Sequence, residues 1–324
     1  MQILPINSEK DLSELKEKAK LSVSGCVLAL GFFDGVHIAH RAIIEKAGNE
    51  AKKLGIPLTV FTFSSSSKAL KPEQVRLFTD SEKLDEFESL GADLTVIFDF
   101  DLIKNVSKDE FIDKILIEKL NTAVAVCGFN FRFGKGASGN AELLSKKMTE
   151  RGRKTVTVAE YTENGNSVSS SVIREMLSEN KLVSAARLLG KPFFIDGKVT
   201  HGLGLGKNLG FPTVNVEIPS EKFSLSNGVY LTAVEISDKL YTGITNVGSC
   251  PTFDERETHT ETFILDFDDN IYQSKIRIYF IKFLRNEIKF SSAEELIMQI
   301  NIDKNRALEL KKEIQWQEIG LSLQ

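Results

Sequence analysis

A glycine-rich stretch followed by alternating polar residues is a candidate phosphate site in this 324-residue sequence. The stretch reads THGLGLGKNLGFPTVNV and covers residues 200–216. Successive side chains of a strand point to opposite faces, so Thr213 and Asn215 share an oxygen-rich face. Glycines let backbone N–H groups approach an anion, and hydroxyl and amide oxygens can hold the magnesium of a nucleoside triphosphate. The alternative is a glycine-rich barrel hairpin whose polar residues face solvent.

Two better-known nucleotide motifs are absent from this stretch. A Walker loop requires glycine where His201 stands and Ser or Thr where Asn208 stands. A dinucleotide fingerprint that begins at Gly204 requires glycine at the position of Leu209. The predicted phosphate site is therefore of another kind.

A second candidate site lies in GFFDGVHIAH, residues 31–40, where a buried strand is predicted to end and a helix to begin. Asp34 and Gly35 favour a tight turn, and His37 and His40 stand three residues apart, on one face of the first helical turn. The positive end of the helix favours a phosphate, and imidazoles beside it can stabilise charge that develops on phosphorus. Two metal-binding histidines form a weaker alternative, because no Cys or carboxylate cluster completes a metal site. The other alternative is a pair of exposed histidines.

Glu261 begins a third candidate site. It opens the predicted strand ETFILDF, residues 261–267, and shares one face with Phe263, Leu265 and Phe267. A carboxylate on an apolar face is costly unless it is paired or used, which is typical of a general base that deprotonates a hydroxyl. A solvated residue at the rim of the strand is the alternative.

The N-terminal half predicts an α/β domain with a doubly wound parallel sheet. Its apolar runs of strand length are separated by helical segments, which is typical of a parallel sheet covered on both sides. The predicted strands are Val27–Phe33, Leu58–Phe63, Leu94–Phe98, Ala123–Phe129 and Thr155–Ala159, and the predicted helices are Ile38–Leu54, Ser81–Leu90 and Asp109–Leu120. Ligands bind at the carboxyl ends of such strands, so we expect the chemistry in the loops that follow Phe33, Phe63 and Phe129.

The pattern changes to strands after Gly190, which ends a predicted helix and precedes Pro192. We therefore predict one domain over residues 1–190 and a second over residues 191–324. Six short strands without a long helix between them favour a six-stranded antiparallel β-barrel, and a C-terminal helix from Ala293 to about Gln317 can pack against it. The predicted strands are Phe193–Thr200, Phe211–Val216, Val229–Ile236, Tyr241–Val247, Thr260–Phe267 and Lys275–Leu284.

Length and composition agree with two domains and argue against several classes of protein. A chain of 324 residues exceeds the usual single-domain size. The net charge of −4 argues against a general nucleic-acid binder. The three cysteines are far apart and lack metal-ligand spacing, which favours reduced thiols in a cytoplasmic protein. We expect no membrane partner, because no apolar run is long enough for a span and the N-terminus lacks a signal-peptide pattern.

The stretch GFFDGVHIAH resembles the GxFDGxHxGH signature of the nucleotidyltransferase superfamily, whose histidines contact the phosphates of ATP. VCGFNFRFGKGASGN and VSSSVIREML, at residues 126–140 and 168–177, resemble later motifs of one branch, the bacterial FMN adenylyltransferases. The resemblance implies that His37, His40 and Arg174 act in catalysis and that Asn130 contacts the flavin or the nucleotide. It implies ATP contacts from Gly31, Phe33, Asp34, Gly35, Ser170 and Ser171. Ala39 departs from the glycine of the signature and Ser171 from the usual threonine; if the Ala39 methyl crowds the nucleotide, adenylylation is slow or lost.

The C-terminal half resembles the riboflavin kinases. HGLGLGKNLGFPTVNV is similar to their glycine loop and PTAN motif, NGVYLTAVEI to their GVY strand, TNVGSCPTFDE to their NxGxxPTF loop, and FLRNEIKF to their LRxExKF segment. The resemblance implies that Glu261 is the catalytic base and that Arg285 and Glu287 shape the flavin site. It also implies that Thr213 and Asn215 bind Mg²⁺ and ATP, with further ATP contacts from Gly202, Gly204, Gly206 and Lys207.

These motifs occur in the order found in the bacterial bifunctional riboflavin kinase/FMN adenylyltransferases, or FAD synthetases. The resemblance implies that ATP phosphorylates riboflavin to FMN and then adenylylates FMN to FAD, with release of pyrophosphate and Mg²⁺ as the cofactor. Riboflavin, FMN and ATP are the expected partners, and the oligomeric state stays open. An enzyme with only one active domain and a non-catalytic flavin-binding regulator are the alternatives. Intact Thr213, Asn215 and Glu261 count against the regulator, because binding alone requires no base.

Overall fold

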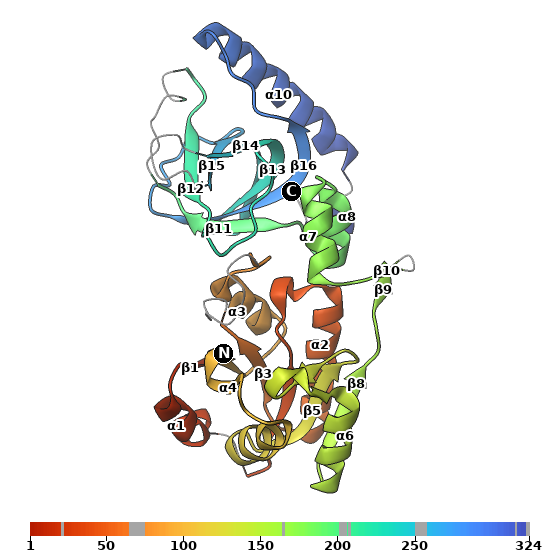
Figure 1. Ribbon diagram of the computed structural model, residues 1–324. Coiled ribbons are helices and arrows are strands. Elements are labelled where there is room, and N and C mark those ends of the chain that lie inside the picture. Colours follow the sequence, from red (N-terminus) through yellow and green to blue (C-terminus); the bar gives the residue numbers. More distant parts are fainter. Residues whose placement is uncertain are drawn as a thin grey trace. The chain divides into compact units, whose positions relative to one another are not determined.

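The computed structural model describes residues 1–20, 23–64, 75–163, 166–200, 206, 209–249, 258–314 and 316–321. It contains two compact units, Met1–Ser170 and Ser171–Gln324 (Figure 1). The predicted boundary between functional domains after Gly190 stays a prediction. Of the helices within the ranges given above, none has the length and apolar character needed to cross a membrane.

The first unit contains the predicted parallel sheet, with strand order β1-β4-β3-β2-β5-β8. Its strands are β1 (Gln2–Ile6), β2 (Cys26–Leu30), β3 (Leu58–Phe63), β4 (Leu94–Phe98), β5 (Thr122–Gly128) and β8 (Lys154–Val158). The sequence did not predict β1, which is short and contains Pro5. Proline lacks a backbone N–H and is tolerated at a sheet edge, which is where β1 lies.

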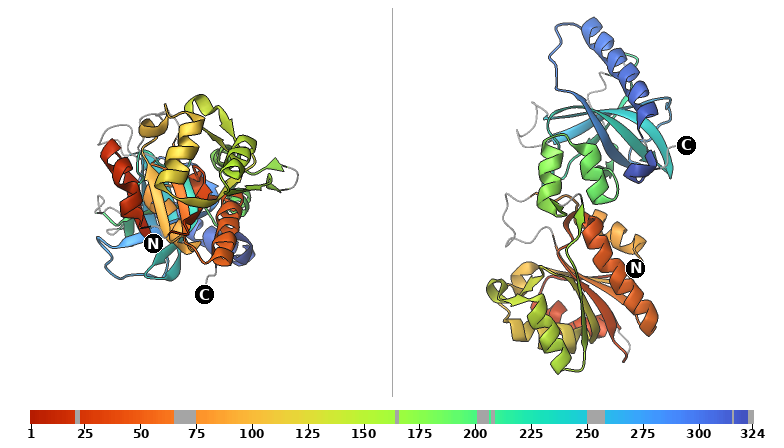
Figure 2. Two further views of the ribbon diagram at one scale, coloured as in Figure 1. Left: turned by 90° about the horizontal axis from the view of Figure 1, so that it is seen from below. Right: turned by 90° about the vertical axis from the view of Figure 1, so that its right-hand side faces the viewer.

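Helices cover both faces of this sheet, as Figure 2 shows. On one face, α2 (Ile38–Leu54) packs against β2 and β5, and Arg41 of α2 pairs with Glu86 of α3 (Asp80–Ser89). On the other face, α1 (Glu9–Ala19), the π-helical segment η2 (Phe111–Lys119) and α6 (Ala141–Glu150) share a core with β2. The doubly wound arrangement is therefore confirmed. The shorter elements are η1 (Asp34–Val36), α4 (Phe100–Ile103), α5 (Lys108–Glu110), β6 (Arg132–Phe133), η3 (Lys135–Ala137), β7 (Gly139–Asn140), β9 (Thr162–Glu163) and β10 (Asn166–Ser167).

The second unit contains the predicted antiparallel barrel, with strand order β11-β16-β13-β14-β15-β12. A bridge between Thr200 and Asn215 joins the two edges of this sheet, so the barrel is nearly closed. The strands are β11 (Phe194–Lys198), β12 (Thr213–Glu217), β13 (Gly228–Ile236), β14 (Lys239–Ser249), β15 (Thr258–Ile264) and β16 (Lys275–Arg285). The helices are α7 (Ser170–Ser178), α8 (Leu182–Leu189), α10 (Ala293–Glu313) and η4 (Trp316–Ile319). Figure 1 shows α10 along the outside of the barrel, where it contacts β14 and β16.

Alternation along the barrel strands separates a buried face from a polar outer face. On β15, Thr260 and Thr262 are fully buried, whereas Glu261 and Phe263 between and after them are half-buried. The predicted strand extends too far, because Asp266 takes the left-handed backbone conformation (φ 56°) and β15 ends at Ile264. Leu265 is therefore buried by a turn and does not share the face of Glu261 as expected.

Candidate active sites

The loop after β2 lies at the point where the order of the parallel strands reverses. From β2 the chain passes to β3 on one side, and later returns to β5 on the other. A crevice at the carboxyl ends of the strands is the usual ligand site at such a switch point. The loops that follow β2 and β5, two of the three predicted to carry the chemistry, both start at this place. Most of the third, after Phe63, lies outside the described residues. Asn130 is exposed in the loop after β5.

The loop after β2 is a strained turn and not the end of a strand as predicted. Phe33 and Val36 both have positive φ, 56° and 37°, which is unfavourable for an L-residue and most of all for a β-branched one. Such backbone strain clusters at functional sites. The Phe33 ring is fully buried and folds back over Gly31, where a Cβ atom would lie 2.7 Å from the ring. Gly31 is therefore required by this close approach, and Phe33 supports the loop through its packing.

Hydrogen bonds from within the first unit hold the turn in place. The buried carboxylate of Asp34 accepts hydrogen bonds from the backbone N–H groups of Leu77 (2.8 Å) and Phe78 (3.4 Å). The hydroxyl of Ser170 donates to the Asp34 carbonyl oxygen at 2.9 Å. The Asp34 and Ser170 side chains therefore fix the loop, and their predicted contacts with ATP stay predictions.

The two histidines stack on each other at the start of α2. His37 is the N-cap, directly before the predicted helix start at Ile38, and its Nδ1 accepts from the His40 backbone N–H (3.4 Å). The ring centroids are 3.6 Å apart, and the ring of Phe33 meets His40 edge-on. His37 is only 2 % exposed, so the alternative of two exposed histidines is wrong.

Burial keeps both imidazoles neutral near pH 7. It lowers the pKa of His37 to about 4. Burial, then the charges of His37 and Lys83, hold the pKa of His40 well below its ordinary value. Because Nδ1 of neutral His37 is an acceptor, its proton is on Nε2, which is free to donate to a phosphate oxygen.

The lowered pKa of His37 predicts a loss of stability in acid. The folded first unit resists protonation of His37 until about pH 4, whereas the unfolded chain takes up the proton near pH 6.5. Full stability is therefore present above pH 6.5 and is lost as the pH falls from 6.5 to 4, by roughly 3 kcal/mol for this group. Hydrogen exchange of the β2 and β5 amides measures the effect. We expect a weaker pH dependence in His37→Asn, whose side chain still caps α2. An equal pH dependence of stability in the unaltered chain and in His37→Asn would contradict a buried, neutral His37.

Two basic side chains near this loop were missed by the sequence analysis. The Arg76 guanidinium lies 4.6 Å from the centroid of the Phe32 ring, and the Lys83 ammonium lies 5.3 Å from it. Lys83 also donates to the Phe63 carbonyl oxygen and pairs with Asp80. Both cations are nearly buried beside the site, where they add positive potential for an anionic ligand. Only the fold reveals them, because their positions in the chain are remote from the histidines.

Two of the predicted phosphate-binding residues of α7, Ser171 and Arg174, belong to the second unit. The guanidinium of Arg174 lies one turn beyond Ser171 and contacts its hydroxyl at 3.4 Å. This spacing is the i, i+3 arrangement that places two side chains on one helix face. Their action on ATP together with the histidines stays a prediction.

The second candidate site is a polar row on the outer face of the barrel. Glu261 of β15 is in register with Asn215 of β12 on one side and with Asn246 of β14 on the other. Residues in register on neighbouring strands share a face, so the three side chains form one row. The Thr213 hydroxyl donates to Glu261 Oε1 at 2.7 Å. The structure therefore brings Thr213, Asn215 and Glu261 together on one face. Asn246, which the sequence analysis included only as part of the TNVGSCPTFDE motif, joins them.

The donor set of this row suits a magnesium ion. The hydroxyl, amide and carboxylate oxygens of Thr213, Asn215 and Glu261 are hard ligands of the kind that Mg²⁺ prefers. Donation to Glu261 leaves the Thr213 oxygen with lone pairs for a cation. Gly206 lies close by, since a Cβ atom there would be 3.3 Å from Thr213 Oγ1. The other predicted loop residues, Gly202, Gly204 and Lys207, lie outside the described residues.

The predicted flavin-binding residues are held by partners that the sequence did not reveal. Arg285 makes a bidentate pair with Asp303 of α10 at 2.8–3.0 Å, and Asp303 is 5 % exposed. Glu287 accepts from the side-chain amides of Asn246 and Asn227, both at 3.3 Å. The Arg285 guanidinium thus joins the end of β16 to α10, and direct contacts of Arg285 and Glu287 with a flavin stay predictions.

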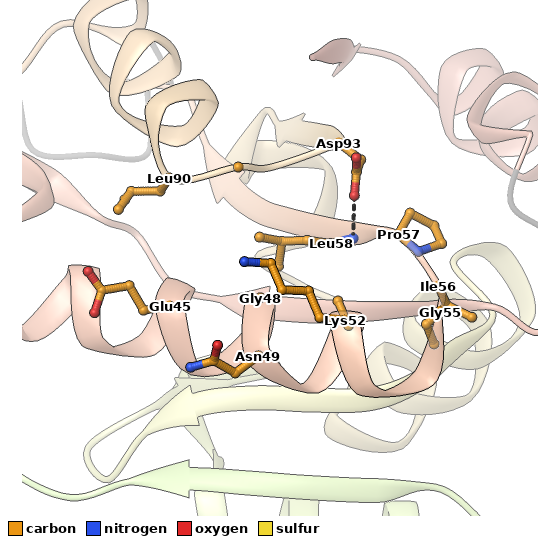
Figure 3. A pocket seen from close by; sticks show the side chains of 12 residues that line it. Glu45, Gly48, Asn49, Lys52, Gly55, Ile56, Pro57, Leu58, Leu90 and Asp93 are labelled. Carbon is orange, nitrogen blue, oxygen red and sulfur yellow. Dashed lines mark hydrogen bonds between the residues drawn. The ribbon is translucent and has the colours of Figure 1, made fainter.

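A pocket of about 830 Å³ lies in the first unit, away from the histidines (Figure 3). It is lined by the second half of α2, by Pro57 and Leu58 where β3 begins, and by Leu90–Asp93 before β4. Asp93 accepts a hydrogen bond from the Leu58 backbone N–H at 2.8 Å. The pocket is at the amino ends of the strands, opposite to the histidines, and none of the predicted site residues lines it.

Comparisons with known proteins agree with two catalytic units. Residues 19–172 match the FAD synthetase family and residues 189–311 match the riboflavin kinase family. The bifunctional riboflavin kinase/FMN adenylyltransferase of Bacillus subtilis is 35 % identical over 290 residues, which cover 87 % of this chain and 91 % of the relative. The protein of the same name from Escherichia coli K12 is 35 % identical over 292 residues, with 88 % and 92 % covered.

A solved structure is similar over nearly the whole chain. It is named a macrolide-efflux protein from Streptococcus pneumoniae, is 26 % identical, and has a TM-score of 0.79 over 93 % of this chain and 98 % of that one. This likeness extends over both units. The curated relatives and the two family matches show that the chain belongs to the bifunctional riboflavin kinase/FMN adenylyltransferase family.

Proposed function

We propose that the second unit transfers the γ-phosphoryl group of ATP to the ribityl 5′-hydroxyl of riboflavin, with Glu261 as the general base. The hydrogen bond between Thr213 and Glu261 carries this proposal, because it joins a predicted metal ligand to the predicted base at 2.7 Å. Thr213 and Asn215 hold Mg²⁺, which neutralises the triphosphate. Phosphoryl transfer depends mainly on positioning and charge stabilisation, and this row of oxygen donors supplies both.

The first unit then transfers AMP from ATP to FMN and releases pyrophosphate. His37 donates from Nε2 to a phosphate oxygen, and His40 stabilises the charge that develops on the α-phosphate. The strained turn, the helix start and the nearby Arg76 and Lys83 support an anion site here. His40 Nδ1 is buried and has no hydrogen-bond partner among the residues that the structure describes. Asn130, exposed at the end of β5, contacts the flavin or the nucleotide.

The cell compartment that suits this function is the cytoplasm. Cys26 and Cys127 are buried free thiols, and burial raises the pKa of each to about 11, so both stay unreactive. ATP is the common substrate of the two units. Reduced thiols and an ATP supply support a cytoplasmic enzyme.

Incubation of the purified chain with riboflavin, MgCl₂ and ATP, followed by separation of the flavins by chromatography, tests both activities. We expect FMN to appear first and FAD to follow. FMN without FAD would contradict adenylylation and point to the Ala39 methyl. Unchanged riboflavin would contradict the kinase.

A further inference from the structure

The polar row around Glu261 continues beyond the residues to which a role has been given. Asn246 of β14 is next to Glu261 in the register and is half-buried. Its side chain binds Glu287, which follows the end of β16. The row therefore runs from Asn215 through Glu261 and Asn246 to Glu287.

The contact with Glu287 fixes the orientation of the Asn246 amide. An ionised carboxylate only accepts hydrogen bonds, so the amide nitrogen of Asn246 must face Glu287 and the amide oxygen must face away from it. Asn227 donates to the other carboxylate oxygen of Glu287 at 3.3 Å. Oδ1 of Asn246 is therefore the end of the amide that points away from Glu287.

Gly248 makes room for this arrangement. A Cβ atom at Gly248 would lie 2.5 Å from Glu287 Oε1, so the glutamate carboxylate would have to move from its present position if residue 248 carried a side chain. The Asn246 side chain binds the Glu287 carboxylate, and the lack of a side chain at Gly248 leaves space for that carboxylate.

The acceptor substrate must pass over Asn246. The attacking and leaving oxygens of a phosphoryl transfer are roughly in line, so the acceptor extends from the base on the side away from the triphosphate. On the proposed kinase function, Thr213 and Asn215 of β12 hold the triphosphate end. The opposite direction from Glu261 leads to Asn246, on a strand about 4.8 Å away.

We propose that Asn246 Oδ1 accepts a hydrogen bond from a hydroxyl of the ribityl chain, and that Glu287 is a positioning residue that acts through Asn246. This inference rests on the proposed kinase function. It assigns Asn246 to recognition of the polyol chain of the acceptor.

Exchanging the two polar groups tests the proposal. In Asn246→Asp, two carboxylates face each other and the residue turns away, so we expect KM for riboflavin to rise about tenfold while kcat changes by less than about threefold. In Asn246→Asp/Glu287→Gln, the glutamine amide donates to the aspartate, which again presents an acceptor to the substrate. We expect KM in the double variant to return to within about threefold of the unaltered chain. Initial rates of FMN formation at saturating ATP and MgCl₂ give both constants.

The controls separate this inference from the function on which it rests. Asn270 is an exposed asparagine of the same unit, and Asn270→Asp is expected to leave KM for riboflavin unchanged. Adenylylation of supplied FMN by each variant reports on intact folding. An unchanged KM in Asn246→Asp, or a double variant no better than the single one, overturns the inference alone. Absence of FMN with the unaltered chain overturns the kinase function and the inference with it.

A second measurement identifies the hydroxyl. Riboflavin analogues that each lack one side-chain hydroxyl are compared in the unaltered chain and in Asn246→Ala. The analogue that lacks the hydroxyl bound by Asn246 is expected to have a higher KM than riboflavin in the unaltered chain. In Asn246→Ala, this analogue and riboflavin are expected to have the same KM. Independent, additive losses for every analogue would contradict a direct contact.

Discussion

Replacing Glu261 with glutamine is expected to lower the rate of riboflavin phosphorylation by about 100- to 10,000-fold, the range that a general base contributes. The change removes the group that takes the proton from the ribityl hydroxyl. It keeps the shape of the side chain, and the glutamine oxygen can still accept from Thr213. The fold of β15 is therefore retained while its chemistry is lost.

The same variant is expected to convert supplied FMN to FAD at the unaltered rate. The histidines, the strained turn and Asn130 all belong to the first unit, and Glu261 belongs to the second. Separate measurements of FMN formed from riboflavin and of FAD formed from FMN decide the point. Loss of both activities in Glu261→Gln would contradict two separate sites.

Glu217→Gln is the matched control. Glu217 lies on β12, on the same face as Asn215, and is exposed. Its replacement removes one negative charge from the same side of the barrel without touching the bond between Thr213 and Glu261. We expect near-normal phosphorylation in this variant. An equal loss in Glu217→Gln and Glu261→Gln would indicate a general charge effect and not a base.

The regular elements of the first unit were predictable from hydrophobic pattern alone. The bounds of β3, β4 and α2 are those expected, because β3 and β4 are continuous apolar runs and the apolar residues of α2 recur with the helical period. The prediction failed at Phe33, which was assigned to the strand. A buried aromatic residue adds to an apolar run equally well from a strand or from a turn. Only the three-dimensional structure shows that its ring folds back over Gly31.

The short motifs of the sites were predictable from the sequence, but the contacts between residues on different strands were not. Alternation along β12 correctly placed Thr213 and Asn215 on one face, since this depends on neighbours in the chain. The row that joins Asn215, Glu261 and Asn246 depends on the register of three strands, and no short stretch of sequence contains that register. The pairing of Arg285 with Asp303 likewise depends on where α10 packs. Long-range contacts of this kind are the part that the sequence left undetermined.

Replacing His37 with asparagine is expected to lower adenylylation of FMN by about 100- to 1,000-fold, the loss that follows removal of one donor to a developing charge. Asparagine is a good N-cap, so α2 still begins correctly. The shorter side chain does not bring an N–H group to the position of Nε2. Phosphorylation of riboflavin is expected to continue at its normal rate, because that site lies in the second unit.

The dependence of adenylylation on pH distinguishes donation by a neutral imidazole from attraction by a charged one. With the pKa of His37 lowered to about 4, kcat/KM of the free enzyme has no step near pH 6.5 from this group and declines only as the pH approaches 4. An imidazolium mechanism requires the opposite, a rise as the pH falls through 6.5. His259→Asn, at a half-buried histidine of β15, is the matched control and should keep full adenylylation. A rise in kcat/KM between pH 7.5 and about 5.5, or an equal loss in His259→Asn, would contradict the role given to His37.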